Sequence, residues 1–201
     1  MRFSNKEIKD LFFAWILISF TFAFFFIGCY NKLIFEKQLF SQSFILILIG
    51  SFLTAGIGFI LHELAHKYIA QGYKLNAEFR AFYNMLWLSI AFSLAGFIIA
   101  APGAVIIKGF ITREKNGKIS LAGPMTNFIL GIVFLVGFIF ISKGFLGLIF
   151  NYGFKINALL AIFNMIPFGA FDGAKIILWN KLVYWTSVIL FLGLFLISFT
   201  K

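Results

Sequence analysis

The stretch Phe44–Ala70, FILILIGSFLTAGIGFILHELAHKYIA, is an apolar run with four ionisable side chains near its end. The run exceeds the roughly 20 apolar residues that a helix needs to cross a bilayer. Charged groups at membrane depth are costly unless they have partners, so these side chains are functional candidates. They are His62, Glu63, His66 and Lys67, but Lys67 is close enough to the end of the run to extend its amine to the interface and is not counted among the candidates.

Apolar runs continue along the rest of the chain, separated by short polar stretches. Of the 201 residues, 62% are hydrophobic and 12% are charged, a composition typical of integral membrane proteins. The chain is therefore expected to form a single all-α domain over residues 1–201, a polytopic helical bundle in a cell membrane. The six runs are Leu11–Tyr30, Phe44–Ala70, Ala81–Ile107, Ile119–Ser142, Ile156–Phe171 and Leu182–Thr200.

The net charge of +10 does not indicate a nucleic-acid-binding protein. The 17 Lys and Arg residues lie between the apolar runs, where basic side chains set membrane topology and contact lipid headgroups. The single cysteine, Cys29, excludes a metal site built from several cysteines. Any metal site must therefore use histidine and carboxylate ligands.

The sequence His62-Glu63-Leu64-Ala65-His66 has the H-E-x-x-H pattern of a zinc site. On a helix, residues four apart lie on one face, so both imidazoles can bind one metal ion while Glu63 reaches a water molecule on it. The alternative is a pair of histidines that are hydrogen-bonded in the core. The chain has only two histidines, and both fall in this motif beside a glutamate, which favours the metal site.

A catalytic zinc site needs a third protein ligand and an open position for water. Outside the H-E-x-x-H motif, Asp172 is the carboxylate in an apolar setting, within Asn164–Gly173, NMIPFGAFDG. Pro167 and Gly169 interrupt the helix there, so the carboxylate can be directed at a neighbouring helix. The alternative role of Asp172 is that of a helix N-cap, and the two roles are compatible.

A third motif, Gly123-Pro124-Met125-Thr126-Asn127, begins the fourth apolar run. Proline is favoured in the first turn of a helix, so Pro124 is expected near a helix start. A buried asparagine needs hydrogen-bond partners, and Asn127 could bind a substrate backbone or the oxyanion of the reaction.

Together the three motifs resemble the signature motifs of the site-2 protease family of intramembrane metalloproteases, in the order of that family. The resemblance covers roughly residues 44–175. It implies that His62, His66 and Asp172 bind one zinc ion and that Glu63 is the catalytic base.

The resemblance also implies that the substrates are membrane-spanning proteins, cut within or near the bilayer after partial unwinding. It places Asn127 and Asn164 close to the substrate. Many members of the family carry PDZ or CBS domains, for which a chain of this length has no room, so the means of selecting substrates is open. The motif-supporting residues are Gly123, Pro124, Pro167 and Gly173.

The expected function is therefore that of a zinc endopeptidase that cleaves membrane proteins. Three alternatives are weighed: a membrane metal transporter in which the same residues form a transit site, a catalytically silent membrane chaperone, and another metalloprotease class with glutamate as its third ligand. Transporters typically contain several polar helices and internal repeats, and neither is evident here. A glutamate beside the first histidine suits hydrolysis, and intact ligands argue against a silent protein.

The depth of the ligands in the membrane decides between two topologies. If all six runs span the membrane, His62 and Asp172 lie toward opposite faces, up to about 25 Å apart. If Ala81–Ile107 instead re-enters and returns to the side of the N-terminus, both ligands lie near that side. Pro102 and Gly103 could support the turn in such a segment.

The distribution of basic residues favours five spans with one re-entrant segment. With six spans, nine of the 17 Lys and Arg residues lie on the side of the N-terminus. With the re-entrant segment, 12 lie there against five, the excess expected of a cytoplasmic face. The N-terminus is therefore expected in the cytoplasm, with the zinc site toward the cytoplasmic leaflet. The 12 residues are Arg2, Lys6, Lys9, Lys67, Lys74, Arg80, Lys108, Arg113, Lys115, Lys118, Lys175 and Lys181.

Overall fold

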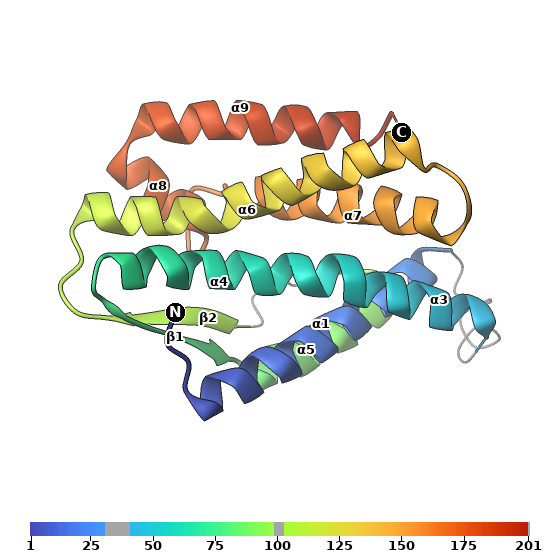
Figure 1. Ribbon diagram of the computed structural model, residues 1–201, viewed down its shortest axis with the longest axis horizontal. Helices are drawn as coiled ribbons and strands as arrows, with labels where there is room; N and C mark the ends of the chain where they lie inside the picture. Colours follow the sequence, from blue (N-terminus) through green and yellow to red (C-terminus); the bar gives the residue numbers. More distant parts are fainter. Residues whose placement is uncertain (31–40, 99–102, 201) are drawn as a thin grey trace.

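A computed structural model describes residues 1–30, 41–98 and 103–200. Over these ranges the chain is mostly helical, and several helices lie along the long dimension of the molecule (Figure 1). The elements are α1 (Asn5–Tyr30), α3 (Gln42–Ser51), the π-helical turn η1 (Phe52–Gly56), α4 (Ile57–Gly72), β1 (Asn76–Ala81), α5 (Tyr83–Leu94), β2 (Gly103–Lys108), α6 (Arg113–Phe140), α7 (Gly144–Phe163), α8 (Asp172–Trp179) and α9 (Lys181–Ile197).

The apolar run that carries the H-E-x-x-H motif becomes one continuous helical segment made of α3, η1 and α4. A π-turn holds one more residue than an α-turn, and such turns are frequent at functional sites. At the first residue of the π-turn, the Phe52 carbonyl accepts a hydrogen bond from the indole of Trp15 at 3.2 Å. This bond holds α1 against the π-turn that precedes α4.

Four helical segments are long and apolar enough to cross a membrane, which agrees with the expected helical membrane protein. The last predicted run, Leu182–Thr200, contains α9, a shorter apolar helix of 17 residues. The four segments are Asn5–Ile27, Gln42–Gly72, Arg113–Phe140 and Gly144–Phe163.

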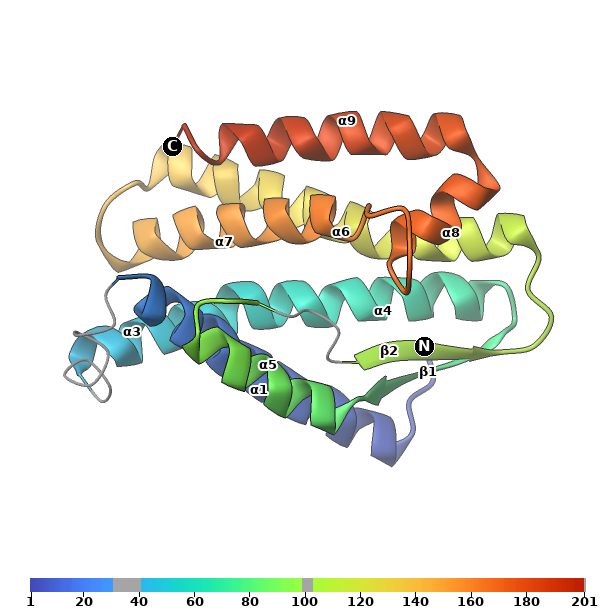
Figure 2. The ribbon, with the colours of Figure 1, turned by 180° about the vertical axis from the view of Figure 1, so that it is seen from behind.

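Helix α4 lies between two groups of elements. On one side α6 and α7 pack together with α9 beyond them, and on the other side lie α1, α5 and the sheet (Figure 1, Figure 2). A core cluster on the α1 side contains Ile18, Phe22 and Phe79, and a second cluster beneath α9 contains Ile176 and Phe191. Helix α4 thus buries the face that carries His62, Glu63 and His66, while Leu61 and Tyr68 on its outer face are exposed.

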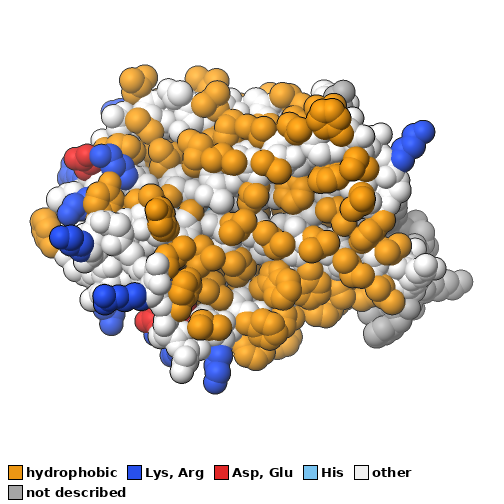
Figure 3. Space-filling model, in the orientation of Figure 1, with side chains coloured by type: hydrophobic (Ala, Val, Ile, Leu, Met, Phe, Trp, Pro, Cys, Tyr) orange, Lys and Arg blue, Asp and Glu red, His pale blue; other side chains and the backbone are white. Residues whose placement is uncertain are grey.

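The surface separates apolar from charged side chains. Hydrophobic side chains cover most of the face seen in Figure 3, including the exposed sides of the long helices. Most Lys and Arg side chains in this view gather toward the end of the molecule that carries the N-terminus and the sheet (Figure 3). An apolar belt with charges at one end is the surface expected of a protein that is embedded in lipid.

The two strands bring the ends of Ala81–Ile107 together. β1 and β2 pair antiparallel, with Asn76 opposite Lys108. Between the strands lies α5, whose 12 residues are too few to cross a bilayer. Residues 99–102, including Pro102, lie outside the described ranges. The segment returns to the end from which it started, and the small sheet that closes it was not expected from the sequence.

Helix α6 begins earlier than the sequence predicts. Its first residue is Arg113 rather than Ile119, so Pro124 lies inside the helix and the prediction of a helix start at this proline was wrong. The Thr112 side chain accepts a hydrogen bond from the Lys115 amide at 3.3 Å and caps the helix. Hydropathy registers only the part of a helix that lies in apolar surroundings, so it misses these polar first turns.

Helix α7 also departs from its predicted bounds. It runs from Gly144 to Phe163, whereas the apolar run was expected over Ile156–Phe171. Lys155 lies within this helix and interrupts its apolar pattern, which accounts for the late predicted start. Pro167 lies in the loop between α7 and α8, where it was expected to interrupt the helix.

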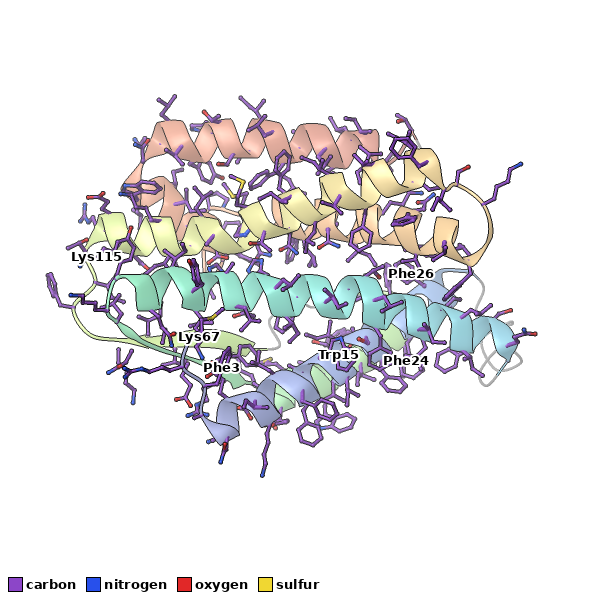
Figure 4. The ribbon with its side chains drawn as sticks, viewed as in Figure 1. Phe3, Trp15, Phe24, Phe26, Lys67 and Lys115 are labelled. Carbon is purple, nitrogen blue, oxygen red and sulfur yellow. The ribbon has the colours of Figure 1, made fainter. Side chains whose placement is uncertain are left out.

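Lys67 is buried, so the prediction that its amine extends to the membrane interface was wrong. The amine forms an ion pair with Glu7 of α1 and lies 3.7 Å from the centre of the Phe3 ring (Figure 4). The second Glu7 oxygen accepts the backbone N–H of Phe79 in β1 at 2.8 Å. A buried ammonium requires partners of this kind, and they tie α1, α4 and β1 together.

Candidate metal centre

The two histidines lie one turn apart on α4, and the first residue of α8 meets them. The Nε2 atoms of His62 and His66 are 3.0 Å apart. The Oδ2 atom of Asp172 is 3.4 Å from the His62 nitrogen and 3.1 Å from the His66 nitrogen. All three side chains are buried. The structure therefore brings together the three residues that the sequence predicts as metal ligands.

The other ring nitrogen of each histidine is held by an acceptor from α6. His66 Nδ1 lies 2.8 Å from the carbonyl oxygen of Ile119, and His62 Nδ1 lies 2.6 Å from Asn127 Oδ1. Both oxygens can only accept a hydrogen bond, so in the neutral imidazoles the proton is on Nδ1. Both Nε2 atoms therefore present their lone pairs toward Asp172.

This arrangement fits a tetrahedral zinc ion. Three electron-rich atoms that face one another in a buried site repel, and a cation between them removes the repulsion. Zinc bonds of about 2.0–2.2 Å place tetrahedral ligands about 3.3–3.6 Å from each other. The observed separations of 3.0, 3.1 and 3.4 Å are close to these distances. Three protein ligands also leave the open position that catalytic zinc sites use.

Gly123 of α6 leaves room in front of the two histidines. A Cβ added to this glycine would lie 2.5 Å from His62 Nε2 and would also overlap the His66 ring. Any side chain here would fill the space that the ligand nitrogens face. This close approach explains why the motif has glycine at this position.

A loop carries Asp172 from the end of α7 to the histidines. The Gly173 amide donates a hydrogen bond to the Asn164 carbonyl at 2.8 Å, which closes the loop. Gly169 turns the chain in the left-handed region with a φ of 67°. Phe171 is the N-cap of α8, so the alternative role of Asp172 as the helix cap is not observed.

The two oxygens of the Asp172 carboxylate have different partners. Oδ2 faces the histidines, and Oδ1 lies 3.4 Å from the amine of Lys175, one turn along α8. A carboxylate binds a metal ion in its ionised form, and the amine of Lys175 is a cationic partner for that form.

A cavity of about 250 Å³ opens in front of the three ligands. Glu63 lines it beside them, so the predicted catalytic base shares this space. The strand β2 forms one wall, and the Val105 amide lies on the same side of the cavity as the Glu63 carboxylate. Other lining residues include Gly103, Ala104, Ile107, Asn164 and Lys175.

The two asparagines that the sequence places near the substrate lie in different surroundings. Asn127 is fully buried behind His62, and its amide nitrogen donates to the Gly58 carbonyl at 3.2 Å and to Asn157 Oδ1 at 3.0 Å. This geometry favours a supporting role behind the histidine for Asn127. Asn164 lines the cavity, and its contact with substrate stays a prediction.

Among the polar side chains that the sequence-based prediction does not include, two contact predicted site residues directly. Asn157 of α7 bonds to Asn127, and Lys175 of α8 faces Asp172. Asn157 is an uncharged amide inside an apolar run. A search of the runs for neutral amides, and not only for ionisable groups, would have found it, because a buried amide also needs partners.

Comparison with known proteins identifies the family. "Putative zinc metalloprotease MJ0611" of Methanocaldococcus jannaschii is 41% identical over 186 residues, which cover 91% of this chain and 89% of the relative. The chain belongs to this zinc metalloprotease family. Zinc is accordingly the metal expected at the group formed by His62, His66 and Asp172.

Two further proteins with lower identity to this chain are also named as zinc metalloproteases. "Zinc metalloprotease MJ0392" of the same organism is 31% identical over 63% of this chain and 32% of its own length. "Putative zinc metalloprotease YwhC" of Bacillus subtilis is 30% identical over 62% of this chain and 66% of its own length. No family model matches the chain, and no solved structure matches it.

Gly123→Ala is expected to lower the zinc content of the purified metalloprotease at least about tenfold, because the added methyl group fills the space that the ligand nitrogens face. Elemental analysis of the protein in detergent measures the content. Gly193→Ala is the control, since a Cβ at this position of α9 meets nothing within 4 Å. Full zinc content in Gly123→Ala would contradict the placement of the ion.

Proposed function

We propose that this chain is an intramembrane zinc endopeptidase of the site-2 protease type, which hydrolyses peptide bonds of membrane-spanning proteins. The observation that carries the proposal is the position of the candidate ligands. His62 and His66 lie on Gln42–Gly72, a helical segment long and apolar enough to cross a membrane. Substrates would therefore be cut at membrane depth, and the cavity beside Glu63 would admit the water that hydrolysis consumes.

The proposed mechanism divides the chemistry among residues that surround the cavity. Bound zinc would lower the pKa of a water molecule and polarise the scissile carbonyl. His62, His66 and Asp172 would hold the ion. As the oxygen of water bonds to the carbonyl carbon, Glu63 takes up its proton and then donates it to the amine that leaves when the C–N bond breaks. Glu63 and Val105 line the same cavity, so the carboxylate is within the space that the water would occupy.

Glu63→Gln is expected to abolish cleavage and to leave zinc bound, because glutamine keeps the shape of the side chain but cannot take up the proton. Loss of a general base lowers rates by about 10²–10⁴-fold. Cleavage of a labelled transmembrane helix in liposomes measures the rate, alongside the zinc content of the same sample. A variant that cleaves at the wild-type rate would remove Glu63 from the role of base.

Asp172→Ala provides the matched comparison for this experiment, because it removes a ligand and is expected to abolish both zinc binding and cleavage. The same liposomes separate the alternative functions. A metal transporter would move zinc across the membrane and leave the peptide intact. A catalytically silent chaperone would bind the helix without moving zinc or cutting the peptide.

We also propose five membrane-spanning helices with Ala81–Ile107 as a re-entrant segment, α9 being the fifth span. The pairing of β1 with β2 supports this topology, because the chain leaves from β1 and returns along β2 beside it, with Ala81 opposite Gly103. The N-terminus and the start of α6 lie at the same end of the molecule, where basic side chains gather (Figure 1, Figure 3). Such an excess is typical of a cytoplasmic face, so this end would lie in the cytoplasm.

Cysteine labelling distinguishes the two topologies in a Cys29→Ser background. With the re-entrant segment, Lys74→Cys and Lys115→Cys are both expected to react with a membrane-impermeant thiol reagent from the cytoplasmic side only. Lys143→Cys, between α6 and α7, is expected to react from the opposite side only. Six spans would place positions 74 and 115 on opposite sides, so labelling of these two from different sides would contradict the proposal.

The outer edge of β2 supports binding of an extended substrate segment. Among the described strands, β2 pairs with β1 alone, and the outer edge of β1 is occupied. The amides of Phe79 and Ala81 donate to Glu7 and Asp10 of α1. In an antiparallel pair, the backbone N–H groups that point away from the partner strand recur at every second residue. Ile107 is in the same register as Phe79 and Ala81, so its N–H points away from β1, and the residue lines the cavity. An unwound substrate could add a strand along this edge.

Ile107→Pro is expected to lower kcat/KM for a transmembrane substrate by about threefold to tenfold, because it removes one outward N–H that the substrate would use. Proline here leaves the bonds between the strands intact, so zinc content is expected to stay unchanged. Ile107→Ala shortens the side chain and keeps the N–H, and its activity is expected to stay close to that of the wild type. Equal losses in both variants would assign the effect to the side chain and contradict strand addition.

A further inference from the structure

A chain of buried amides connects α7 to His62. The side chains of Asn157 in α7 and Asn127 in α6 are fully buried, and they are joined by a hydrogen bond of 3.0 Å. Asn127 Oδ1 lies 2.6 Å from His62 Nδ1. Burying two amides in an apolar bundle is costly unless their polar atoms are bonded, so this pair must be held by its surroundings.

The backbone carbonyls beside Asn157 and Asn127 determine which atom of each amide donates and which accepts. Asn157 Nδ2 donates to the Gly153 carbonyl at 2.9 Å, which leaves Asn157 Oδ1 as the acceptor that faces Asn127. Asn127 Nδ2 also donates to the Gly58 carbonyl at 3.2 Å. Because these partners can only accept, Asn127 must turn its oxygen toward His62. His62 then carries its proton on Nδ1 and keeps Nε2 available for a metal ion.

Helix α4 approaches Asn157 closely because residue 58 is glycine. A Cβ at Gly58 would lie 2.5 Å from Asn157 Oδ1 and 3.3 Å from its Nδ2. Any larger residue here would push the Asn157 amide away from Asn127. Gly58 precedes His62 by one turn, so α4 carries the ligand His62 and also leaves room for the Asn157 side chain.

We propose that Asn157 is a positioning residue for the metal site, acting through Asn127 to hold His62 in the tautomer that binds zinc, with Gly58 as the residue that admits it. The inference rests on the proposed zinc site and extends it beyond the three sequence motifs. His66 does not depend on this chain, because its Nδ1 bonds to a backbone carbonyl. It is therefore an internal reference for any experiment on His62.

The tautomers can be measured directly, because the chain has only two histidines. In metal-free protein labelled with isotopic histidine, nitrogen NMR distinguishes protonated from unprotonated ring nitrogens at a pH where both rings are neutral. The wild type is expected to carry the proton on Nδ1 of both rings. Gly58→Ala and Asn157→Leu are expected to shift His62 toward the Nε2-protonated form and to leave His66 unchanged.

The same two variants are expected to bind zinc about tenfold more weakly than the wild type in competition with a chelator, a loss typical of residues behind a metal ligand. Gly50→Ala controls for Gly58→Ala, because its Cβ meets nothing within 4 Å in the same helical segment. Thr54→Val controls for Asn157→Leu, because it removes a buried hydrogen bond to the Gly50 carbonyl, away from His62. Both controls are expected to bind zinc as the wild type does.

Each outcome of these measurements decides a separate point. Alanine is a better helix former than glycine, so weaker zinc binding by Gly58→Ala cannot arise from a weaker helix. An unchanged His62 tautomer and unchanged zinc affinity in both variants, or an equal shift of His66, would overturn the role of Asn157. A wild-type chain that binds no zinc would contradict the proposed function instead, and the His62 tautomer would still test Asn157.

Discussion

The close approach of three lone pairs in a buried site is the constraint on which the rest of the structure depends. Two imidazole nitrogens and a carboxylate oxygen lie 3.0–3.4 Å apart, and their repulsion is strong where water does not screen it. Holding them there takes partners from several elements. α4 supplies the histidines, α6 places an acceptor behind each of them, and the loop after α7 delivers Asp172. The packing of these helices therefore determines the geometry of the site.

The candidate site could be predicted from the sequence because its chemistry is rare in its surroundings. His62, Glu63 and His66 stand out in an apolar run, and the need for a third ligand singles out Asp172, which the structure places beside them. Asn157 could not be found in this way. It carries no charge, and its partner Asn127 lies 30 residues away, so its role depends on a contact between helices that spacing along the chain does not reveal.

The fold was predicted less completely, for a related reason. Hydropathy reports which residues meet apolar surroundings, whereas a helix begins where its first hydrogen bond and cap form. The polar first turns of α6 and the charge of Lys155 in α7 therefore led to late predicted starts. Lys67 is buried because it pairs with Glu7, 60 residues away. The strands are six residues each and are stabilised by pairing with one another, so neither has a clear signal alone.

The π-turn in the middle of Gln42–Gly72 has a further consequence for how this protein fits a membrane. In an α-helix each residue turns the side-chain direction by about 100°, so one inserted residue redirects everything beyond it. A π-turn takes up one residue and leaves the turns on either side with their directions unchanged. Because η1 lies before His62 and His66, the start of the segment can differ in length by one residue while both rings still face Asp172. The turn thus lets α3 and α4 each face their own neighbours within one continuous helical segment.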